Sequence, residues 1–409
     1  MSNKFKSMDD FEFENKTVLV RIDINSPVDP TSGIILDDTR IKLHSETLKE
    51  LSSKGAKIVI LAHQSRPGKT DFTRLKQHSE VLSKVLGIHV NYVDSLFSSS
   101  AKEEIRNLKP GEIILLENVR FFAEETLKRS IEEQSESIMV KELAPLCDIF
   151  INDAFAAAHR SQVSLVGFTE NLPSAAGRVM EKELTILYDA LENVEKPCVF
   201  VLGGMKADDS ITVMENVLRD GVADKVITSG IVANILLSAA NVDIQPVNEE
   251  FIKSKGYSNM INKSKDLLTE FKDKIVYPKD VALNVDGERK DVSIYEIENY
   301  SIFDIGEETV KEYAKLIRNA KTIFANGPAG VFEDPQFAIG TEDIINAIAN
   351  SDGYSIIGGG HIAAATVNLG LDSKMDHVSS GGGACINLLA GKELPAVEAL
   401  KRSANKNYY

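Results

Sequence analysis

Short runs of apolar and β-branched residues recur along the chain, and polar or helix-patterned segments separate them. In the first half these runs are Thr17–Ile22, Lys57–Ala62, Ile88–Val93, Glu112–Leu116 and Asp148–Asn152. In the second half they are Cys198–Leu202, Asp224–Thr228, Ile275–Tyr277, Thr322–Ala325 and Tyr354–Ile357. Short continuous apolar runs are typical of strands that are buried on both faces. The pattern therefore predicts two series of buried parallel strands.

Between the strands, apolar residues recur at the spacing of a helix. Such stripes are formed by Ile41, Leu48 and Leu51, by Leu82, Val85 and Leu86, and by Ile211, Met214 and Leu218. Gly55 and Gly87 follow the first two stripes, as expected of residues that end helices. Strands that alternate with helices are typical of an α/β protein with parallel sheets. We therefore expect two Rossmann-like parallel-sheet domains.

The junction between the two series is predicted at residues 171–194, where Leu172–Pro173–Ser174 interrupts the pattern and a long helical stripe follows. We expect an N-terminal domain over 1–173, a hinge helix over 174–188 and a C-terminal domain over 189–393, with a cleft between the domains. The tail, 394–409, carries a helical pattern at Val397–Ala404 and is predicted to pack on the first domain. The halves share no residue signature, so a duplication is not supported.

Composition narrows the class of protein. The 409 residues are 43% hydrophobic and 26% charged, as in soluble globular proteins, and the net charge of −15 argues against binding to nucleic acid or anionic lipid. Residues 1–16 lack the apolar core of a signal peptide, and no apolar run reaches the about 18 residues of a membrane helix. Cys147, Cys198 and Cys385 are odd in number and far apart, so we expect buried, reduced thiols in a cytoplasmic protein.

Polar and cationic residues follow the strands of the first half. They are Arg21, Asp23, Asn25, Arg40, His63, Arg66, Arg120, His159 and Arg160. Ligands of open parallel sheets bind at the carboxyl ends of strands, so this set predicts a pocket for a small, multiply charged anion. Each arginine alone would also fit a surface ion pair, each histidine a core position, and Asp23 and Asn25 a turn cap.

The strand ends of the second half carry glycines instead. The segments are Gly203–Gly204–Met205–Lys206, Asn326–Gly327–Pro328–Ala329–Gly330, Gly358–Gly359–Gly360–His361 and Gly381–Gly382–Gly383. Glycine lets a ligand approach the backbone, and a glycine run that opens a helix directs unpaired N–H groups at phosphate oxygens. This favours a nucleoside triphosphate, although a single glycine run is also typical of a turn and Lys206 could be a solvated side chain.

Other phosphate-binding motifs do not fit. Gly68–Lys69–Thr70 resembles the end of a P-loop, but His63 stands where its first glycine is required. The HRD and DFG elements of protein kinases are absent from the sequence, and no GxGxxG opens either series. A dinucleotide-dependent dehydrogenase is therefore the weakest alternative.

The chain resembles the phosphoglycerate kinase family over nearly its whole length, and its archaeal branch most. In the first half the resemblance lies in Arg21–Pro27, Ala62–Pro67, Leu115–Phe121 and Asn152–Arg160. In the second half it lies in Gly203–Lys206, Asn326–Glu333 and Val378–Gly383. It implies reversible phosphoryl transfer from 1,3-bisphosphoglycerate to Mg-ADP, giving 3-phosphoglycerate and ATP, by closure of a hinge.

The resemblance also implies roles for single residues. Those expected to hold 3-phosphoglycerate or 1,3-bisphosphoglycerate are Asp23, Asn25, Arg40, His63, Arg66, Arg120 and Arg160. Those expected around ADP or ATP are Gly204, Lys206, Gly230, Asn326, Gly327, Gly330, Val331, Glu333, Gly358, Gly359, Gly360 and His361, with Glu333 on the ribose. We expect Arg40, Lys206 and the amides after Gly360 and Gly383 to neutralise the transferred group.

The chain departs from the pattern of most bacterial and eukaryotic members at four positions. Ser210 replaces a second lysine, Ala325 a tryptophan, His361 an aspartate near the magnesium, and Met205 a small residue. Mg²⁺ is expected with the nucleotide, but no protein ligand to it is assigned. A kinase for another small carboxylate and a non-catalytic nucleotide-binding or scaffold protein stay as alternatives. A monomer is expected, and a homodimer stays open.

Overall fold

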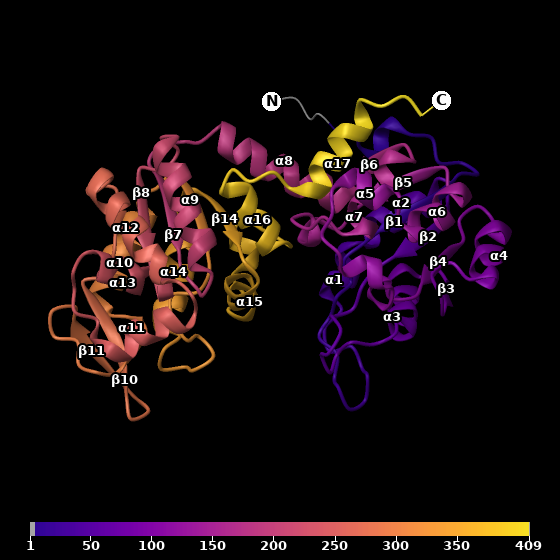
Figure 1. The fold of residues 1–409 in the computed structure, drawn as a ribbon. Coiled ribbons are helices and arrows are strands. Elements are labelled where there is room, and N and C mark those ends of the chain that lie inside the picture. The colour runs from indigo at the N-terminus through magenta and orange to yellow at the C-terminus, as the bar shows by residue number, and fades with distance from the viewer. Residues whose placement is uncertain (1–4, 409) are drawn as a thin grey trace. The chain divides into compact units, whose positions relative to one another are not determined.

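The protein, a computed structural model that describes residues 5–408, divides into two compact units (Figure 1). Unit 1 comprises Met1–Thr185 and Glu393–Tyr409, and unit 2 comprises Ile186–Lys392. Residues 1–4 of the charged N-terminal stretch and residue 409 of the tail lie outside the described residues. Helix α8, Arg178–Glu192, begins in unit 1 and ends in unit 2. That residues 174–188 act as a hinge stays a prediction.

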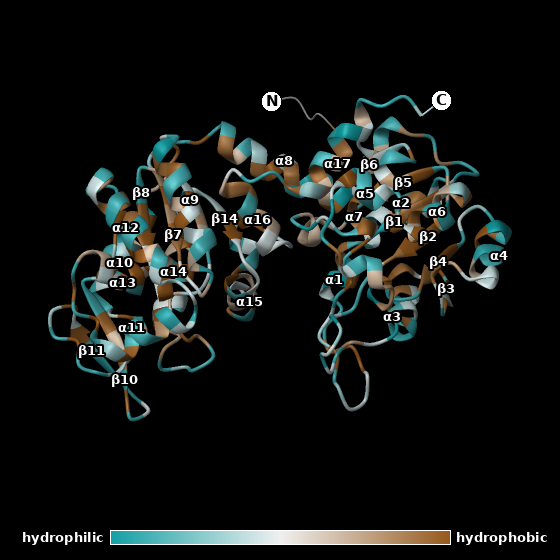
Figure 2. Cartoon of the chain, viewed as in Figure 1, coloured by the Kyte–Doolittle hydropathy of each residue, from teal (hydrophilic) through white to brown (hydrophobic). Residues whose placement is uncertain are grey.

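In the described residues, unit 1 is built on a six-stranded parallel sheet with the order β3-β4-β2-β1-β5-β6. Its strands are β1 (Thr17–Arg21), β2 (Lys57–Leu61), β3 (Val90–Val93), β4 (Ile113–Leu116), β5 (Ile149–Asn152) and β6 (Ser174–Ala176). The first five confirm the predicted strands. Their side chains are largely buried, and Figure 2 shows the hydrophobic strands β1, β2 and β5 inside the unit, with hydrophilic segments on α3 and α4.

Helices and short 3-10 turns surround this sheet. The α-helices of unit 1 are α1 (Thr39–Leu43), α2 (Ser45–Ser53), α3 (Lys76–Leu86), α4 (Ser99–Asn107), α5 (Ile131–Ser135), α6 (Ile138–Leu143), α7 (Val163–Val166) and α17 (Pro395–Ala404). The 3-10 turns are η1 (Met8–Asp10), η2 (Val119–Phe121), η3 (Ala123–Thr126), η4 (Ala144–Leu146), η5 (Phe155–Ala157) and η6 (Gly167–Glu170). Helix α17 packs on β6 and α7, and Ser403 Oγ accepts a hydrogen bond from Ser174 N at 3.1 Å.

Unit 2 holds, within the described residues, a six-stranded parallel sheet with the order β15-β14-β13-β7-β8-β9. Its strands are β7 (Cys198–Leu202), β8 (Lys225–Thr228), β9 (Ile275–Val276), β13 (Thr322–Asn326), β14 (Tyr354–Gly358) and β15 (His377–Val378). The five predicted strands of the second half are confirmed. Every residue of β7 and β13 is buried, which explains their continuous apolar sequence.

The helices of unit 2 show the expected stripes. They are α9 (Ala207–Arg219), α10 (Gly230–Ala239), α11 (Gln245–Ser254), α12 (Ser258–Glu270), α13 (Glu307–Arg318), α14 (Ile339–Ala349), α15 (Gly360–Asn368) and α16 (Gly382–Leu389), with the 3-10 turn η7 (Asp372–Lys374). In α13, acidic residues occupy the first turn and basic residues the last, which complements the helix dipole. Its buried Tyr313 donates a hydrogen bond to Thr228 O at 2.7 Å, so the helix is fastened to the end of β8.

Unit 2 also contains a second sheet, which the sequence pattern did not predict. Strands β10 (Asp280–Val285), β11 (Glu288–Ser293) and β12 (Ser301–Ile305) form a three-stranded antiparallel sheet with the order β11-β10-β12. Asp286 and Gly287 connect β10 to β11 with φ of 52° and 97°, the conformation that an Asp-Gly hairpin turn requires. This dipeptide was therefore a usable signal.

Three further details differ from the expectations. The stripe from Ile41 to Leu51 forms two helices that break at His44, whose ring turns inward. The predicted break was Leu172–Pro173–Ser174, but Ser174 already belongs to β6, because pairing with β5 and not β-propensity decides so short a strand. Cys198 and Cys385 are buried as expected, but Cys147 is only partly buried, and the described residues contain free thiols rather than a disulfide.

Candidate active site

Arg21 ends β1, and its guanidinium lies inside unit 1, with 1% of the residue exposed. Its Nε donates to Ser164 Oγ at 2.8 Å, and that hydroxyl donates to Glu125 Oε1 at 2.7 Å. Burial lowers the pKa of Arg21 and raises the pKa of Glu125. Their mutual attraction opposes both shifts, because Glu125 raises the pKa of Arg21 and Arg21 lowers the pKa of Glu125. Because a buried charge needs a partner, Glu125 and Ser164 hold Arg21 in place.

Asp23 follows β1 and organises the loop beside Arg21. Its Oδ2 accepts a hydrogen bond from Arg40 Nη1 at 2.8 Å, and its Oδ1 accepts one from Asn25 N at 3.1 Å. Asn25 Oδ1 in turn accepts from Ser65 N at 2.7 Å, which ties the loop to the end of β2. Burial alone would raise the pKa of Asp23, but His63 and the cations Arg40 and Arg21 lower it below its usual range. Asp23 is therefore an ionised carboxylate that orients Arg40.

His63 and the two cations Arg120 and Arg160 lie around Arg21. His63 is 4% exposed, and its Nδ1 lies 3.0 Å from Arg21 Nη2. Burial lowers the pKa of His63 far below its usual value, and Arg21, Arg120 and Arg160 also oppose its protonation. Burial lowers the pKa of Arg120 to about 10, and the charges of Arg160 and Arg21 add to this. Cations that repel one another in this way favour a ligand with several negative charges.

The structure therefore brings together most of the residues predicted to form the anion pocket of the first half: Asp23, Asn25, Arg40, His63, Arg120 and Arg160. Arg66 is the exception. It is exposed on the loop that follows β2, and no ion pair within residues 5–408 holds its guanidinium. The side chain of Arg40 is 44% exposed, so part of its guanidinium stays available to a ligand.

Two buried residues that the sequence reasoning left out of the site connect it to α8. His44 Nε2 accepts a hydrogen bond from Asp23 N at 3.1 Å, and His44 Nδ1 lies 2.7 Å from Asp153 Oδ2. Since the backbone amide donates to Nε2, the ring proton lies on Nδ1 and is donated to Asp153. Asp153 Oδ1 accepts from Val179 N at 2.8 Å, in the first turn of α8. Asp153 belongs to a motif that the sequence shows, whereas His44 carries no signal of its own.

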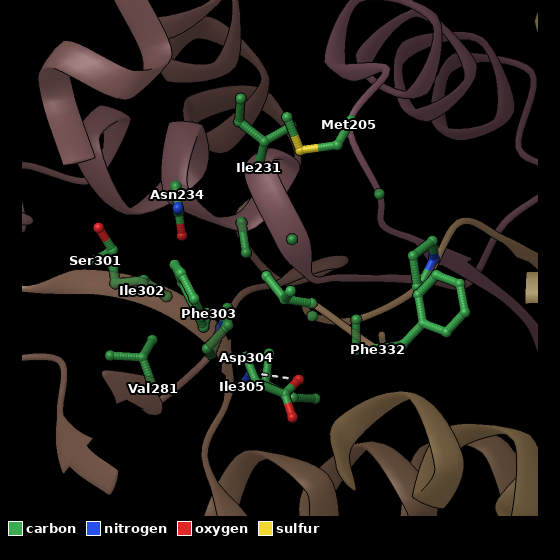
Figure 3. Close-up of a pocket in the computed structure, with 18 of the residues that line it drawn as sticks. Met205, Ile231, Asn234, Val281, Ser301, Ile302, Phe303, Asp304, Ile305 and Phe332 are labelled. Carbon is green, nitrogen blue, oxygen red and sulfur yellow. Dashed lines mark hydrogen bonds between the residues drawn. The ribbon is translucent and has the colours of Figure 1, made fainter. Parts of the chain in front are cut away.

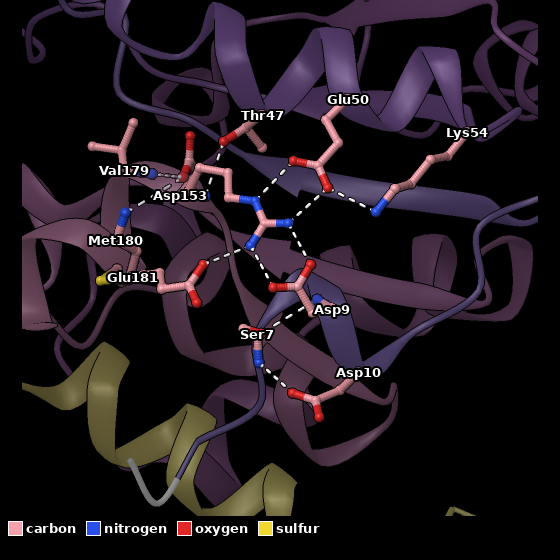
Figure 4. Close-up of polar contacts among 11 residues, drawn as sticks. Ser7, Asp9, Asp10, Thr47, Glu50, Lys54, Asp153, Val179, Met180 and Glu181 are labelled. Carbon is pink, nitrogen blue, oxygen red and sulfur yellow. Dashed lines mark hydrogen bonds and ion pairs between the residues drawn. The ribbon is translucent and has the colours of Figure 1, made fainter. Parts of the chain in front are cut away.

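Arg178 fastens the same turn of α8 to unit 1 (Figure 4). Its guanidinium contacts three carboxylates, with distances of 2.6 Å to Asp9 Oδ1, 2.7 Å to Glu50 Oε1 and 2.9 Å to Glu181 Oε2. Arg178 N also donates to Thr47 Oγ1 at 3.0 Å. The hydrogen bonds of Arg178 lower the pKa of Glu50 to about 2. The start of α8 is therefore held by charge as well as by backbone hydrogen bonds.

In unit 2 the loops after β7, β8 and β13 touch backbone to backbone. A Cβ at Gly327 would lie 2.4 Å from Gly203 O, and a Cβ at Gly230 would lie 2.8 Å from Gly204 N. Gly204 N donates to Pro328 O at 2.8 Å, and Gly230 N donates to Ala329 O at 3.0 Å. These glycines are required by close approach, and because their amides already have acceptors, Gly204 and Gly230 shape a wall rather than offer free N–H groups.

Free amides are found where helices begin. Lys206 precedes α9, and α15 and α16 begin at Gly360 and Gly382, so the first-turn N–H groups of these helices have no acceptor within their own helix. They border a cavity of about 300 Å³ whose walls include Gly204, Lys206, Asn326, Gly327, Gly359, Gly360, His361 and Gly383. Lys206 is exposed. Helix N-termini and a lysine around one cavity are suited to phosphate groups.

A second cavity of about 220 Å³ lies next to the first, because Gly204, Met205, Pro328 and His361 are in the walls of both (Figure 3). Most of its walls are apolar, and Ile302 and Phe303 on β12 contribute to them. The predicted residues in its walls are Gly204, Gly230, Gly330, Val331, Glu333 and His361. Gly358, by contrast, ends β14 and lies in neither wall. An apolar cavity that continues into a phosphate cavity fits a nucleoside and its phosphates.

The four departures from the family pattern have different surroundings. Ser210 is fully buried on α9 and so does not replace a lysine at the phosphate cavity, and Ala325 is buried in β13. Met205 is 46% exposed and lies in the walls of both cavities. His361 lies at the start of α15, and the centroid of its ring is 5.9 Å from the centroid of the Phe332 ring.

The described residues contain no group of three histidine, cysteine or carboxylate side chains that could hold a metal ion. Mg²⁺ keeps several waters and takes phosphate oxygens readily, with only one or two carboxylates from a protein. The donor set of this chain therefore does not fit a metal held by the protein alone. Among the helices of residues 5–408, none is long and apolar enough to cross a membrane.

Known proteins match the chain over nearly its whole length. The protein-family model described as phosphoglycerate kinase matches residues 8–392. The phosphoglycerate kinase of Methanothermobacter thermautotrophicus is 62% identical over 403 residues, 98% of each chain, and that of Methanothermus fervidus is 56% identical over 404 residues, 99% of this chain and 98% of the relative. A crystal structure of phosphoglycerate kinase from Pyrococcus horikoshii OT3 superposes with a TM-score of 0.91 at 42% identity, covering 98% of this chain and 100% of that chain. Sequence and fold comparisons therefore agree.

Proposed function

The chain belongs to the phosphoglycerate kinase family, and from that premise we propose how its residues carry out the reaction. Its activity is reversible phosphoryl transfer between 1,3-bisphosphoglycerate and ADP, giving 3-phosphoglycerate and ATP, a step of glycolysis. The alternatives of a dehydrogenase and a non-catalytic scaffold are set aside by the near full-length relatives. What remains to be assigned is the role of each residue.

The observation that supports the assignment is that unit 1 gathers arginines at its strand ends, whereas unit 2 places helix N-termini and Lys206 around a cavity. In unit 1 we assign 3-phosphoglycerate, or the acyl phosphate, to the cluster around Arg21. Arg40, Arg120 and Arg160 would pair with its phosphate and carboxylate groups, and neutral His63 would donate a hydrogen bond. We assign Arg66 the same ligand, which its exposed guanidinium would reach from the loop after β2.

In unit 2 we assign ADP or ATP to the two joined cavities. The apolar cavity would take the base, and Glu333 in its wall would accept hydrogen bonds from the ribose hydroxyls. The phosphates would lie in the cavity bordered by Lys206 and by the starts of α15 and α16. Gly204, Gly230 and Gly327 contribute by keeping the wall free of side chains.

Phosphoryl transfer requires positive charge near the transferred group and alignment of the attacking and leaving oxygens. Phosphoryl transfer passes through a loose, in-line transition state with charge on three equatorial oxygens. We propose that Arg40 and Lys206 neutralise that charge, together with the amides that follow Gly360 and Gly383. The attacking oxygen belongs to a carboxylate or a phosphate and is already ionised, so no general base is required.

Mg²⁺ would arrive with the nucleotide and screen the charge of its phosphates. Because the described residues hold no ligand cluster, we assign no protein ligand to it. His361, an imidazole where an acidic ligand is expected, weakens the case for a direct protein contact at that position.

Since the two ligands are assigned to different units, their reacting groups must be brought together before the phosphoryl group is transferred. We propose residues 174–188 as the hinge, because α8 begins in unit 1, ends in unit 2 and is fastened at its first turn by Asp153 and Arg178. Closure would also exclude water. We further propose a cytoplasmic protein, on the free thiols and the acidic net charge of −15, and a monomer, with a homodimer as the alternative.

A coupled assay of ATP-dependent acyl phosphate formation tests the function. The substrate is 3-phosphoglycerate, acetate, aspartate and glycerate are the controls, and Mg²⁺ is varied. We expect turnover that is confined to 3-phosphoglycerate and depends on Mg²⁺. Turnover with another carboxylate and none with 3-phosphoglycerate would contradict the substrate assignment.

A further inference from the structure

The apolar cavity of unit 2 contains one buried amide that the rest of the fold does not use. Asn234 lies in the N-terminal half of α10, and it is 5% exposed. Figure 3 shows its side chain in the wall of the cavity, at the end where Ser301 and Ile302 of β12 lie. Within residues 5–408 its side-chain amide has no hydrogen-bond partner. An amide that lines a cavity and has no partner in the protein is available to a ligand in that cavity.

Asn248 is a second asparagine in the same wall, and its side-chain amide is fully hydrogen-bonded within the protein. Its Nδ2 donates to Ile244 O at 2.7 Å and to Tyr300 O at 3.0 Å, and its Oδ1 accepts from Ile302 N at 2.9 Å. Those bonds join α11 to β12 and leave the side chain occupied. Asn234 has the same chemistry and similar burial, yet its side chain makes no such bonds and lines the cavity (Figure 3).

We propose that Asn234 is the residue that recognises the nucleobase, by pairing its amide with the edge of a purine. An asparagine amide presents one donor and one acceptor side by side, which match the 6-amino group and the adjacent ring nitrogen of adenine. Apolar residues such as Ile231 and Phe303 surround it in the wall and hold the base without reading its edge. The amide is thus satisfied by the nucleotide, which explains why it is unpartnered in the protein alone.

This inference rests on the proposed function, because it assumes that the base occupies the apolar cavity. Its test compares ATP with purine riboside triphosphate, which has the same shape and lacks only the 6-amino group. The wild-type protein should prefer ATP by about tenfold in kcat/KM at saturating 3-phosphoglycerate. In Asn234→Leu the preference should fall to about onefold, because leucine offers no partner to either base.

A matched control is Asn346→Leu. Asn346 is exposed on α14 of the same unit, outside both nucleotide cavities, so this variant should keep the wild-type preference for ATP. Calorimetric binding of ADP and of purine riboside diphosphate gives a second readout that does not depend on turnover. If Asn234→Leu does not fold, Asn234→Ala is measured in the same way, since it removes the amide and adds no bulk.

The outcomes separate the two proposals. A wild-type protein that shows no ATP-dependent turnover of 3-phosphoglycerate would overturn the proposed function. An active wild-type protein whose preference for ATP persists in Asn234→Leu and Asn234→Ala would overturn only the role of Asn234. Loss of the preference in both variants, with retention in Asn346→Leu, would support it.

Discussion

The two proposed anion sites are built from different parts of the chain. Unit 1 uses side chains: arginines gather at strand ends, and buried carboxyl groups such as Glu125 and Asp23 hold them in place. Unit 2 uses the backbone: glycines let its loops touch, and the starts of α15 and α16 supply N–H groups. A site built from side chains should therefore fail when a side chain is removed, whereas a site built from backbone should fail when a side chain is added.

The largest effect is expected at Lys206. It is an exception to the comparison, because it is a charged side chain in the proposed phosphate site of unit 2, which is otherwise built from backbone groups. Lys206→Ala should lower kcat by about 10³-fold, since a cation next to the transferred phosphoryl group acts in the transition state. The KM for 3-phosphoglycerate should stay nearly unchanged. Steady-state kinetics with Lys265→Ala, an exposed lysine on α12, provide the control. Normal turnover in Lys206→Ala would refute its catalytic role.

The next effect tests backbone contact directly. A Cβ at Gly382 would lie 2.3 Å from Gly359 Cα, whereas a Cβ at Gly360 would meet nothing within 4 Å. Gly382→Ala should therefore lower the free energy of unfolding of unit 2 by about 3 kcal/mol, and Gly360→Ala by less than about 1 kcal/mol. Thermal and denaturant unfolding measure both variants. Equal losses would mean that close approach is not what requires glycine at residue 382.

Removing a side chain from unit 1 should weaken binding without harming the fold. Arg66→Ala should raise the dissociation constant of 3-phosphoglycerate by about 30-fold, as expected for the loss of a charge-assisted hydrogen bond, and leave the affinity for ADP unchanged. Equilibrium titration measures both ligands. Arg106→Ala, an exposed arginine on α4, serves as the control. Unchanged affinity for 3-phosphoglycerate would remove Arg66 from the site.

The smallest effect is expected for the ion pairs between Arg178 and its three carboxylate partners in unit 1. Arg178→Ala should lower the free energy of unfolding of unit 1 by about 1.5 kcal/mol at pH 7, because it leaves Glu50, Asp9 and Glu181 unpaired. Arg178 lowers the pKa of Glu50 from 4.5 to about 2, so this stabilisation is present above about pH 4.5 and is lost as the pH falls toward 2.

Denaturant unfolding at pH 7, 4 and 2.5 measures this dependence. The difference between the wild-type protein and Arg178→Ala should shrink as the pH falls. Arg129→Ala, an exposed arginine of unit 1, should behave like the wild-type protein throughout. A difference that stays constant with pH would show that packing, rather than the ion pairs, accounts for the loss.

The predicted strands were found because burial on both faces leaves a continuous apolar signal, as in Cys198–Leu202. That signal is missing in β6 (Ser174–Ala176), which is a short strand of small residues. It is also missing in β11 (Glu288–Ser293), which is polar and partly exposed. Pairing with a neighbouring strand decides both. The antiparallel sheet matters for function, because β12 forms part of the wall of the apolar cavity and its absence from the prediction hid that wall.

At the site, the order of the residues is enough to show which chemistry lies at which strand end: cations after β2, β4 and β5, and glycines after β7, β13 and β14. It also determined the family, since those residues recur as ordered motifs. Tertiary structure decided which of these groups share a hydrogen-bond network, that His44 and Asp153 join Asp23 to α8, and that the amide of Asn234 faces a cavity. The physical reason is that residue type follows from local sequence, whereas burial and pairing depend on segments that are distant along the chain.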